Sequence, residues 1–248
     1  TPDPVFNSTF NAWHKQQALF GAEWCRWGWM GYRDIVQHAM GCSSFYPERT
    51  REILLTAFRH QYSSGLALRG WNPIDTKEYS DSALWLVFTL TTYLRETGEK
   101  VFLDVKVPFY DKGEATVLGH IRRALDFLES NKGAHRLLLI KFGDWNDSLT
   151  GIGKGGKGES VWLSMAYSEA LQQMAGNVAP SFMRPLEKML NVDLYMDGYS
   201  NIFNLPEYND IAKARSFLDT VTNKDEFTNV LVNRDDGLMI TIGDENSG

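Results

Sequence analysis

Apolar side chains recur at helical spacing along most of the first 175 residues. The segments 5–20, 48–62 and 115–131 each place their apolar positions along one stripe, with polar residues elsewhere. Recurrence in steps of three and four residues predicts amphipathic helices. Residues 32–40 begin a further helix, and Pro47 is suited to a first helical turn.

Two other segments are apolar on nearly every side. The first, Ala83–Tyr93, lies in a helix that we expect to run from an N-cap at Ser80 to about Thr97, with Gly98 as its stop. The second is Ser160–Met174. A helix that is apolar all round is buried all round. Buried helices surrounded by amphipathic ones predict an all-α fold in two concentric layers.

The segments between these helices are read as loops, with few exceptions. The regions 21–31 and 63–79 are rich in glycine and tryptophan. Leu137–Ile140 is either a short strand or a buried extended segment. After Gly176 the pattern weakens, and the expectations are helices at 181–191 and 207–221 and a strand around Met239–Thr241.

Composition excludes several classes of function. The 248 residues are 43% hydrophobic and 23% charged, with a net charge of -6 and scattered Lys and Arg. This balance disfavours nucleic acid and anionic membrane as partners. The longest apolar run, Ala83–Leu90, is far shorter than a membrane span. Cys25 and Cys42 are expected to be unpaired, which fits a reducing, cytoplasmic compartment.

Residues 143–162 form the stretch richest in candidate chemistry. They carry three carboxylates, two tryptophans and six glycines between two apolar segments. The run Gly151–Lys157 resembles a phosphate-binding loop, but Gly158 stands where the magnesium-binding Ser or Thr is needed. We therefore reject nucleotide binding.

A second cluster lies at the start of the helix predicted at residue 32. Arg33 and Gln37 share one helix face, and Asp34 and His38 share another. A surface helix with a local ion pair would explain this spacing equally well.

Two further clusters have ordinary structural explanations beside the functional ones. Ser80 and Asp81 are explained by a helix N-cap followed by an acid in the first turn. Asp144 to Asp147 would suit a surface turn. However, Trp145 in the middle of that turn favours a cleft that holds a ligand.

Metal and nucleophile sites are not indicated. The five histidines show no HxxxH or HExxH spacing, and there is no GxSxG sequence. What remains is a set of carboxylates, arginine and tryptophan, and glycoside chemistry uses such a set. No metal and no cofactor are expected.

Four stretches, in order, resemble motifs of one family. Gly143-Asp-Trp-Asn-Asp147 with Gly158-Glu-Ser-Val-Trp-Leu163 resembles the signature of glycoside hydrolase family 94, the cellobiose and chitobiose phosphorylases and their relatives. Thr1–Asp3, Gly31–Gln37 and Ser80–Leu86 resemble other motifs of that family. The resemblance covers residues 1–175. His38, Ser82 and Ser148 depart from the family motifs, which indicates a divergent branch, such as one that uses longer β-glucans.

The resemblance implies an (α/α)6 barrel. The helices predicted here are too few to close that ring, so we expect one truncated catalytic domain over 1–248, with 176–248 unassigned. The implied reaction is inverting phosphorolysis of a β-linked gluco-oligosaccharide, with inorganic phosphate as co-substrate and a sugar 1-phosphate as product. A homodimer is one assembly left open.

The resemblance also implies the roles of individual residues. Asp147 is the expected general acid. The expected substrate-binding residues are Arg33, Asp34, Gln37, Asp81, Trp145, Asn146 and Glu159.

Two alternatives remain open. An inverting hydrolase would need a second carboxylate as base, Glu159 or Asp34, about 6.5–9.5 Å from the acid. A non-catalytic carbohydrate-binding module would need no base.

Overall fold

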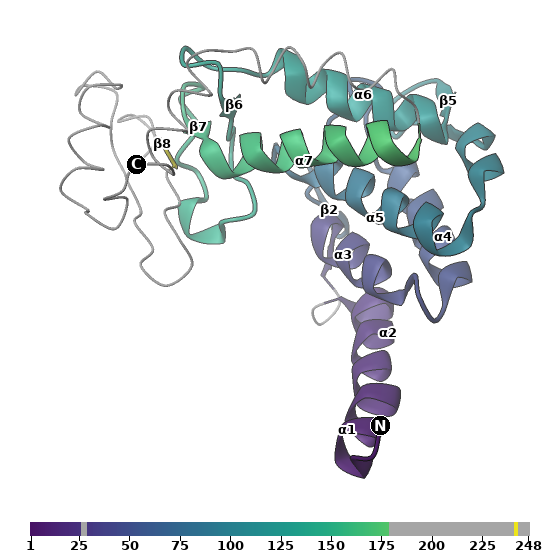
Figure 1. Cartoon of the computed structure of the whole chain (residues 1–248). Helices are drawn as coiled ribbons and strands as arrows, with labels where there is room; N and C mark the ends of the chain where they lie inside the picture. The colour runs from purple at the N-terminus through teal and green to yellow at the C-terminus, as the bar shows by residue number, and fades with distance from the viewer. Residues whose placement is uncertain (26–28, 179–240, 243–248) are drawn as a thin grey trace. The chain divides into compact units, whose positions relative to one another are not determined.

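The computed structural model describes residues 1–25, 29–178 and 241–242 (Figure 1). The chain divides into two compact units, Thr1–Phe127 with Gly176–Val178, and Leu128–Ala175 with the described strand at 241–242. Helices dominate the described residues, as the periodicity predicted. Within the described ranges, no helix combines the length and apolar character that a bilayer span requires.

The chain begins with a continuous helical stretch. It consists of α1 (Pro4–Ser8), the π-helical turn η1 (Thr9–His14) and α2 (Lys15–Trp24). The Asp3 carboxylate caps α1 by accepting the N–H groups of Val5 and Phe6 at 2.8 and 3.0 Å. The loop expected from residue 21 therefore begins too early, because the helix continues to Trp24.

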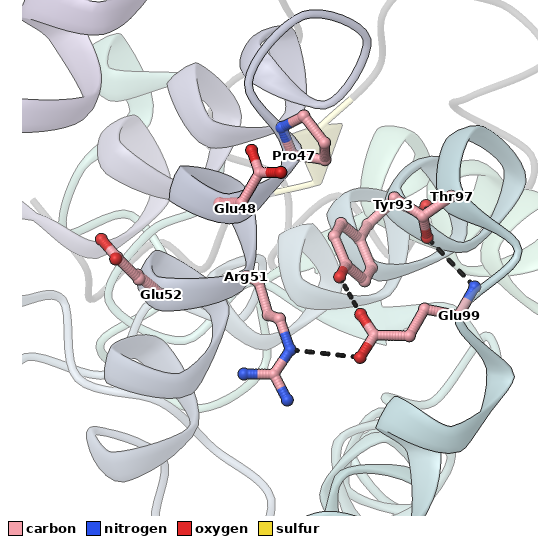
Figure 2. A pocket seen from close by; sticks show the side chains of 7 residues that line it. All are labelled: Pro47, Glu48, Arg51, Glu52, Tyr93, Thr97 and Glu99. Carbon is pink, nitrogen blue, oxygen red and sulfur yellow. Dashed lines mark hydrogen bonds and ion pairs between the residues drawn. The ribbon is translucent and has the colours of Figure 1, made fainter.

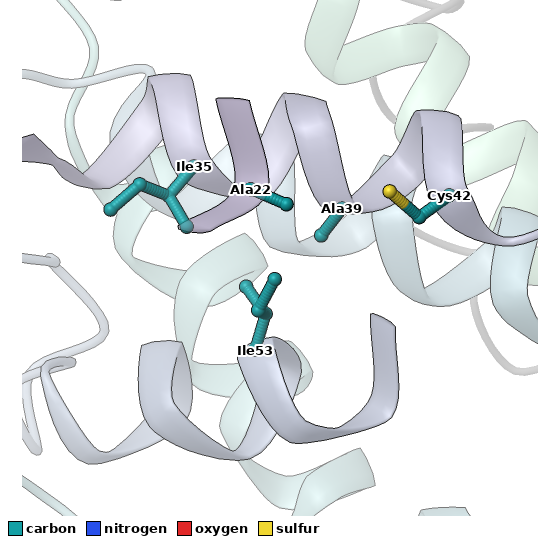
Figure 3. Close-up of a cluster of buried hydrophobic side chains, with 5 residues drawn as sticks. All are labelled: Ala22, Ile35, Ala39, Cys42 and Ile53. Atoms are coloured by element: carbon teal, nitrogen blue, oxygen red, sulfur yellow. The ribbon is translucent and has the colours of Figure 1, made fainter. Parts of the chain in front are cut away.

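A small apolar core joins the next helices. α3 (Tyr32–Cys42) packs against α2, and α4 (Pro47–Arg59) packs against α3, with Pro47 in the first turn as predicted. Figure 3 shows their buried side chains meeting, namely Ala22, Ile35, Ala39, Cys42 and Ile53. Neither cysteine is in a disulfide, as expected.

The prediction of a loop throughout 63–79 is wrong at Gly70–Asn72 and Ile74–Asp75, which are strands. A three-stranded antiparallel sheet is formed by β1 (Met30–Gly31), β2 (Gly70–Asn72) and β3 (Ile74–Asp75). The chain turns between Trp71 and Ile74, which are register partners. The strands are too short to show alternation of apolar and polar residues, so the sequence pattern gave no signal.

Helix α5 (Ser82–Thr97) is the buried helix expected from its apolar surface. Ala83, Leu86, Val87 and Leu90 are fully enclosed. The helix ends as predicted at Gly98, whose φ of 68° lies in the left-handed region that glycine adopts without strain. The predicted N-cap is wrong by one residue, because Asp81, not Ser80, stands at that position.

The segment after α5 leads into the amphipathic helix predicted at 115–131. It contains the 3-10 turn η2 (Lys100–Asp104) and the antiparallel pair β4 (Lys106–Pro108) and β5 (Glu114–Thr116). The helix itself is α6 (Val117–Ser130). Its inward positions are Val117, Ile121, Ala124 and Leu128.

In the second unit, a loop connects two strands of a small sheet, and a long helix follows. Strands β6 (Leu138–Leu139), β7 (Glu159–Ser160) and β8 (Thr241–Ile242) form an antiparallel sheet in that order. The 3-10 turn η3 (Asp147–Leu149) lies in the loop, and α7 (Val161–Asn177) follows β7 directly.

Of the two alternatives for Leu137–Ile140, the structure has the strand, and the helix predicted at Ser160–Met174 is confirmed. Thr241, at the end of the predicted strand Met239–Thr241, is in β8. The helices expected at 181–191 and 207–221 lie outside the described residues.

Candidate functional site

The first unit brings together two predicted site residues that are far apart in sequence. Arg33, at the start of α3, donates from Nη1 to Oδ2 of Asp81 at 3.2 Å. The indole N–H of Trp85 donates to the same oxygen at 3.0 Å. Asp81 is fully buried and Arg33 is nearly so. The Gly-Tyr-Arg-Asp and Ser-Asp motifs therefore form one polar cluster at the beginnings of α3 and α5.

The backbone around Arg33 is held tightly. The Tyr32 hydroxyl donates to the Ala57 carbonyl at 2.9 Å, and burial raises the pKa of this hydroxyl well above its usual range. Gly31 has no room for a side chain, because a Cβ there would stand 2.4 Å from Oδ2 of Asp34. Asp34 is thus buried beside Gly31, whereas Gln37 is half-buried further along α3.

The second unit holds the loop that carries Asp147. Asp144 is 1% exposed, and its Oδ1 accepts the N–H of Asn146 at 2.9 Å. The Asn146 side chain in turn accepts the N–H and the hydroxyl of Ser148 at 3.2 and 2.7 Å. Asp147 lies between these two capped turns and is exposed to solvent. The local structure therefore fixes the backbone of Asp147 and leaves its carboxylate accessible.

An aromatic surface lies beside this loop. The rings of Trp145 and Trp162 stack with centroids 5.5 Å apart and an interplanar angle of 26°. Trp145 is 44% exposed, although it is a large apolar side chain. A supported, exposed indole face provides a flat apolar surface for a ligand.

Glu159 has a different environment from Asp147. It is 2% exposed, and its Oε2 accepts the N–H of Leu137 at 3.1 Å. Its Oε1 accepts the backbone N–H of His135 at 3.1 Å and lies 3.1 Å from the Nδ1 of the same residue. A Cβ on Gly133 would stand 2.2 Å from Oε1. Glu159 thus holds the 133–137 loop against β7, with both oxygens engaged.

Ser160 is a hydroxyl partner of this loop that was not among the predicted site residues. Ser160 donates from Oγ to Oδ2 of Asp144 at 2.5 Å and accepts the N–H of Leu163 at 3.1 Å. Its position just before an apolar helix is a signal that could have identified it as an N-cap. The contact with Asp144 joins residues 16 apart and has no sequence signature.

A surface cavity lies between α4 and α5, away from the predicted residues of that unit. It has a volume of about 440 Å³ and is lined by the residues drawn in Figure 2. Tyr93 donates to Glu99, and Arg51 Nε lies 3.4 Å from the same carboxylate. Burial, together with the Glu99 carboxylate, raises the pKa of Tyr93 to about 12. None of the predicted site residues lines this cavity.

Metal ligands are not clustered in the part of the chain that the structure describes. No group of three or more His, Cys, Asp or Glu side chains there is arranged to hold an ion.

Comparison with known families places most of the chain in one of them. The model of the catalytic domain of the glycosyl hydrolase 94 superfamily matches residues 1–181. The chain is 43% identical over 175 residues to solabiose phosphorylase from Paenibacillus borealis, covering 71% of this chain and 23% of that protein. It is 29% identical over 240 residues to N,N'-diacetylchitobiose phosphorylase from Vibrio proteolyticus, covering 82% of this chain and 29% of that protein.

The end of the chain resembles a second family. The model of the HrcA protein C terminal domain matches residues 157–248. The heat-inducible transcription repressor HrcA of Alkaliphilus metalliredigens is 34% identical over 106 residues, covering 41% of this chain and 30% of that protein. The two matched ranges overlap at 157–181. The chain spans about a quarter of the length of the phosphorylases that it matches.

Proposed function

The chain belongs to the glycosyl hydrolase 94 superfamily, and from this premise we propose that it carries the acid-bearing part of an inverting glycoside phosphorylase. Its helices would form part of an (α/α)6 barrel. The substrate would be a β-linked gluco-oligosaccharide, since similar proteins are named as phosphorylases of disaccharides. Inorganic phosphate is the proposed co-substrate and no cofactor is proposed. We also propose a cytoplasmic location, which fits two cysteines that are not in disulfides.

One observation carries the assignment of Asp147 as general acid. The stretch 143–162 has three carboxylates, and two of them, Asp144 and Glu159, are buried with their oxygens in hydrogen bonds. Asp147 alone of the three is exposed. It can therefore reach the oxygen of a glycosidic bond, whereas the other two are held inside the fold.

The proposed reaction exchanges one bond for another at the anomeric carbon. A phosphate oxygen forms a bond to that carbon from the face opposite the leaving group, and the glycosidic C–O bond breaks. Asp147 gives its proton to the departing oxygen. The products are a sugar 1-phosphate of inverted configuration and a saccharide shortened by one unit. Because phosphate is already a nucleophile, no protein base is required.

The remaining predicted residues would bind the sugar. Trp145 offers an exposed, supported ring for the apolar face of a pyranose. Arg33 and Gln37 would hold sugar hydroxyls. Asp34 and Asp81 are buried, which favours a supporting role for these two predicted sugar ligands. Asn146 supports the acid by capping the turn that contains it. The predicted sugar contact of Glu159 is untested, and its hydrogen bonds to the 133–137 loop favour a supporting role.

The hydrolase alternative is disfavoured by the same geometry. A base that activates water needs an accessible oxygen, and both oxygens of Glu159 already accept backbone N–H groups in a buried setting. Asp34 is also buried. Phosphate dependence of sugar release separates the two reactions directly.

The experiment uses a chimera, because the chain corresponds to about a quarter of its phosphorylase relatives. Residues 1–178 replace the matched segment of solabiose phosphorylase, and the unaltered relative serves as positive control. The chimera is incubated with β-linked disaccharides and longer β-glucans, with and without phosphate. We expect a sugar 1-phosphate only when phosphate is present, and none from the Asp147→Asn variant.

Other outcomes would contradict the proposal. Sugar release that does not depend on phosphate would indicate a hydrolase. A folded chimera that binds saccharide but turns none over would indicate a non-catalytic binding module. We attribute none of the glycoside chemistry to residues 182–248, which lie beyond the glycoside family match and within the match to the repressor domain.

A further inference from the structure

We propose that Asp144 is a positioning residue, which holds Asp147 in place by connecting the acid-bearing turn to the beginning of α7. The inference rests on the proposed function for its catalytic consequence. The hydrogen bonds that support it are independent of that function.

The first half of the connection runs from Asp144 to the helix. Its Oδ2 accepts the hydroxyl of Ser160 at 2.5 Å. The same hydroxyl oxygen accepts the N–H of Leu163 at 3.1 Å, so Ser160 satisfies one of the N–H groups that a helix leaves open at its beginning. The three residues are buried. The carboxylate is thus tied to the first turn of a 17-residue helix.

The helix end of this connection is itself anchored. Ser164 donates from Oγ to the carbonyl of Ser160 at 2.8 Å and accepts the N–H of Leu138 at 2.9 Å. Leu138 belongs to β6, which pairs with β7. Asp144 therefore binds Ser160 at a place where the backbone is held by both the sheet and the helix.

The second half runs from Asp144 to the acid. Its Oδ1 accepts the N–H of Asn146 at 2.9 Å, which fixes the residue just before Asp147. The Asn146 side chain then accepts the N–H of Ser148, which fixes the residue just after it. Asp147 is thus held on one side by the turn that Asp144 caps and on the other by the turn that Asn146 caps. A displacement of about 1 Å at a catalytic group can cost on the order of 100-fold in rate.

Asp144 itself is unsuited to donate the proton. It is buried, and its two oxygens accept from Asn146 and Ser160. Its role would be to place a neighbouring carboxylate, and the test must separate this effect from general destabilisation.

The chemical test uses two kinds of substrate in the chimeric enzyme. Asp144→Asn places an NH2 group where one acceptor oxygen stood, so the charge-assisted hydrogen bond that Ser160 donates to Asp144 is lost. For a disaccharide, we expect kcat to fall about 100-fold with KM changed little. A dinitrophenyl glycoside needs no protonation of its leaving group, so its phosphorolysis should fall by less than about fivefold.

Three variants complete the design. Ser160→Ala should reproduce the pattern of Asp144→Asn, and combining Asp144→Asn with Asp147→Asn should add nothing to the loss caused by Asp147→Asn alone. The exposed Asp126→Asn in α6 should leave both substrates unaffected. Equal losses on both substrates would overturn the proposal and indicate a general structural role.

A second measurement keeps the proposal decidable if the chimera proves inactive. In the full chain, amide hydrogen exchange is compared between the unaltered protein and Asp144→Asn. We expect faster exchange at Asn146 and Ser148 and unchanged exchange at Leu90 in the centre of α5. Unchanged exchange at Asn146 and Ser148 would overturn the proposal that Asp144 holds the acid-bearing turn. Inactivity of the unaltered chimera would count against the proposed function alone.

Discussion

Nη1 of Arg33 and Oδ2 of Asp81 lie 3.2 Å apart, although 48 residues separate them in the sequence. Removing the arginine leaves a buried carboxylate without its countercharge. We therefore expect Arg33→Ala to lower the free energy of unfolding by about 3 kcal/mol. Urea denaturation followed by circular dichroism measures this loss.

Two variants control for the ion pair. Lys106 and Glu114 form an exposed pair at 3.1 Å, so Lys106→Ala should cost less than about 1 kcal/mol. Adding Asp81→Asn to Arg33→Ala removes the unbalanced charge and should restore part of the lost stability. If Arg33→Ala costs no more than Lys106→Ala, the pair does not hold the two helix beginnings together.

The helices could be predicted because their side chains repeat along the sequence. The apolar surface of Ala83–Tyr93 predicts a buried helix whatever surrounds it. Gly98 predicts the end of that helix, because glycine adopts the left-handed φ of 68° found there without strain. The β1–β2–β3 sheet could not be predicted in this way. Its pairing of Gly31 with Gly70 joins distant backbone segments, and two glycines carry no side-chain pattern.

Acid should destabilise the first unit through His120. Burial, and to a lesser extent the Arg123 charge, lowers the pKa of this imidazole, which lies 2.7 Å from Oε1 of Gln61 and 2.9 Å from the Val107 carbonyl. The folded protein thus binds this proton less readily than the unfolded chain does. The contribution to stability is complete above about pH 6.5 and is lost as the pH falls below that value.

Unfolding measured at about pH 7.5 and about pH 5 tests this dependence. His120→Asn should be less stable than the unaltered protein at the higher pH and should lose less on acidification. The exposed His14→Asn should keep the full dependence. An identical pH dependence in His120→Asn and the unaltered protein would exclude His120 as its source.

Gly133 is expected to tolerate no side chain, because a Cβ there would stand 2.2 Å from Oε1 of Glu159. The three hydrogen bonds of that carboxylate hold it in place, so it cannot easily move away from an added Cβ. Gly133→Ala should therefore cost about 1–3 kcal/mol in the free energy of unfolding. Gly176→Ala, where a Cβ would meet nothing within 4 Å, should be neutral or stabilising. Equal effects at the two positions would mean that Glu159 moves freely.

The environments of the three loop carboxylates show what the sequence could and could not reveal. A Trp between Asp144 and Asp147 singled out the turn as a ligand site. The local residue pattern did not distinguish a buried Asp144 from an exposed Asp147, because Ser160, which Asp144 binds, lies outside the turn. Ser160 and the N–H groups of the 133–137 loop decide which carboxylates are engaged.

Trp145 should contribute to saccharide affinity through its exposed ring. Its stacking on Trp162 restricts its motion, so a sugar face can bind without much further ordering of the side chain. Trp145→Ala in the chimeric enzyme should raise the Kd for a disaccharide about tenfold, which corresponds to an aromatic contact of about 1.4 kcal/mol. Isothermal titration measures the change directly.

Two control variants separate the loss of a ring that contacts the sugar from the loss of any exposed tryptophan. Trp145→Phe keeps a flat ring and should recover most of the affinity, whereas Trp24→Ala removes an exposed indole from α2 and should change nothing. An unchanged Kd in Trp145→Ala would show that the exposed face does not contact the sugar.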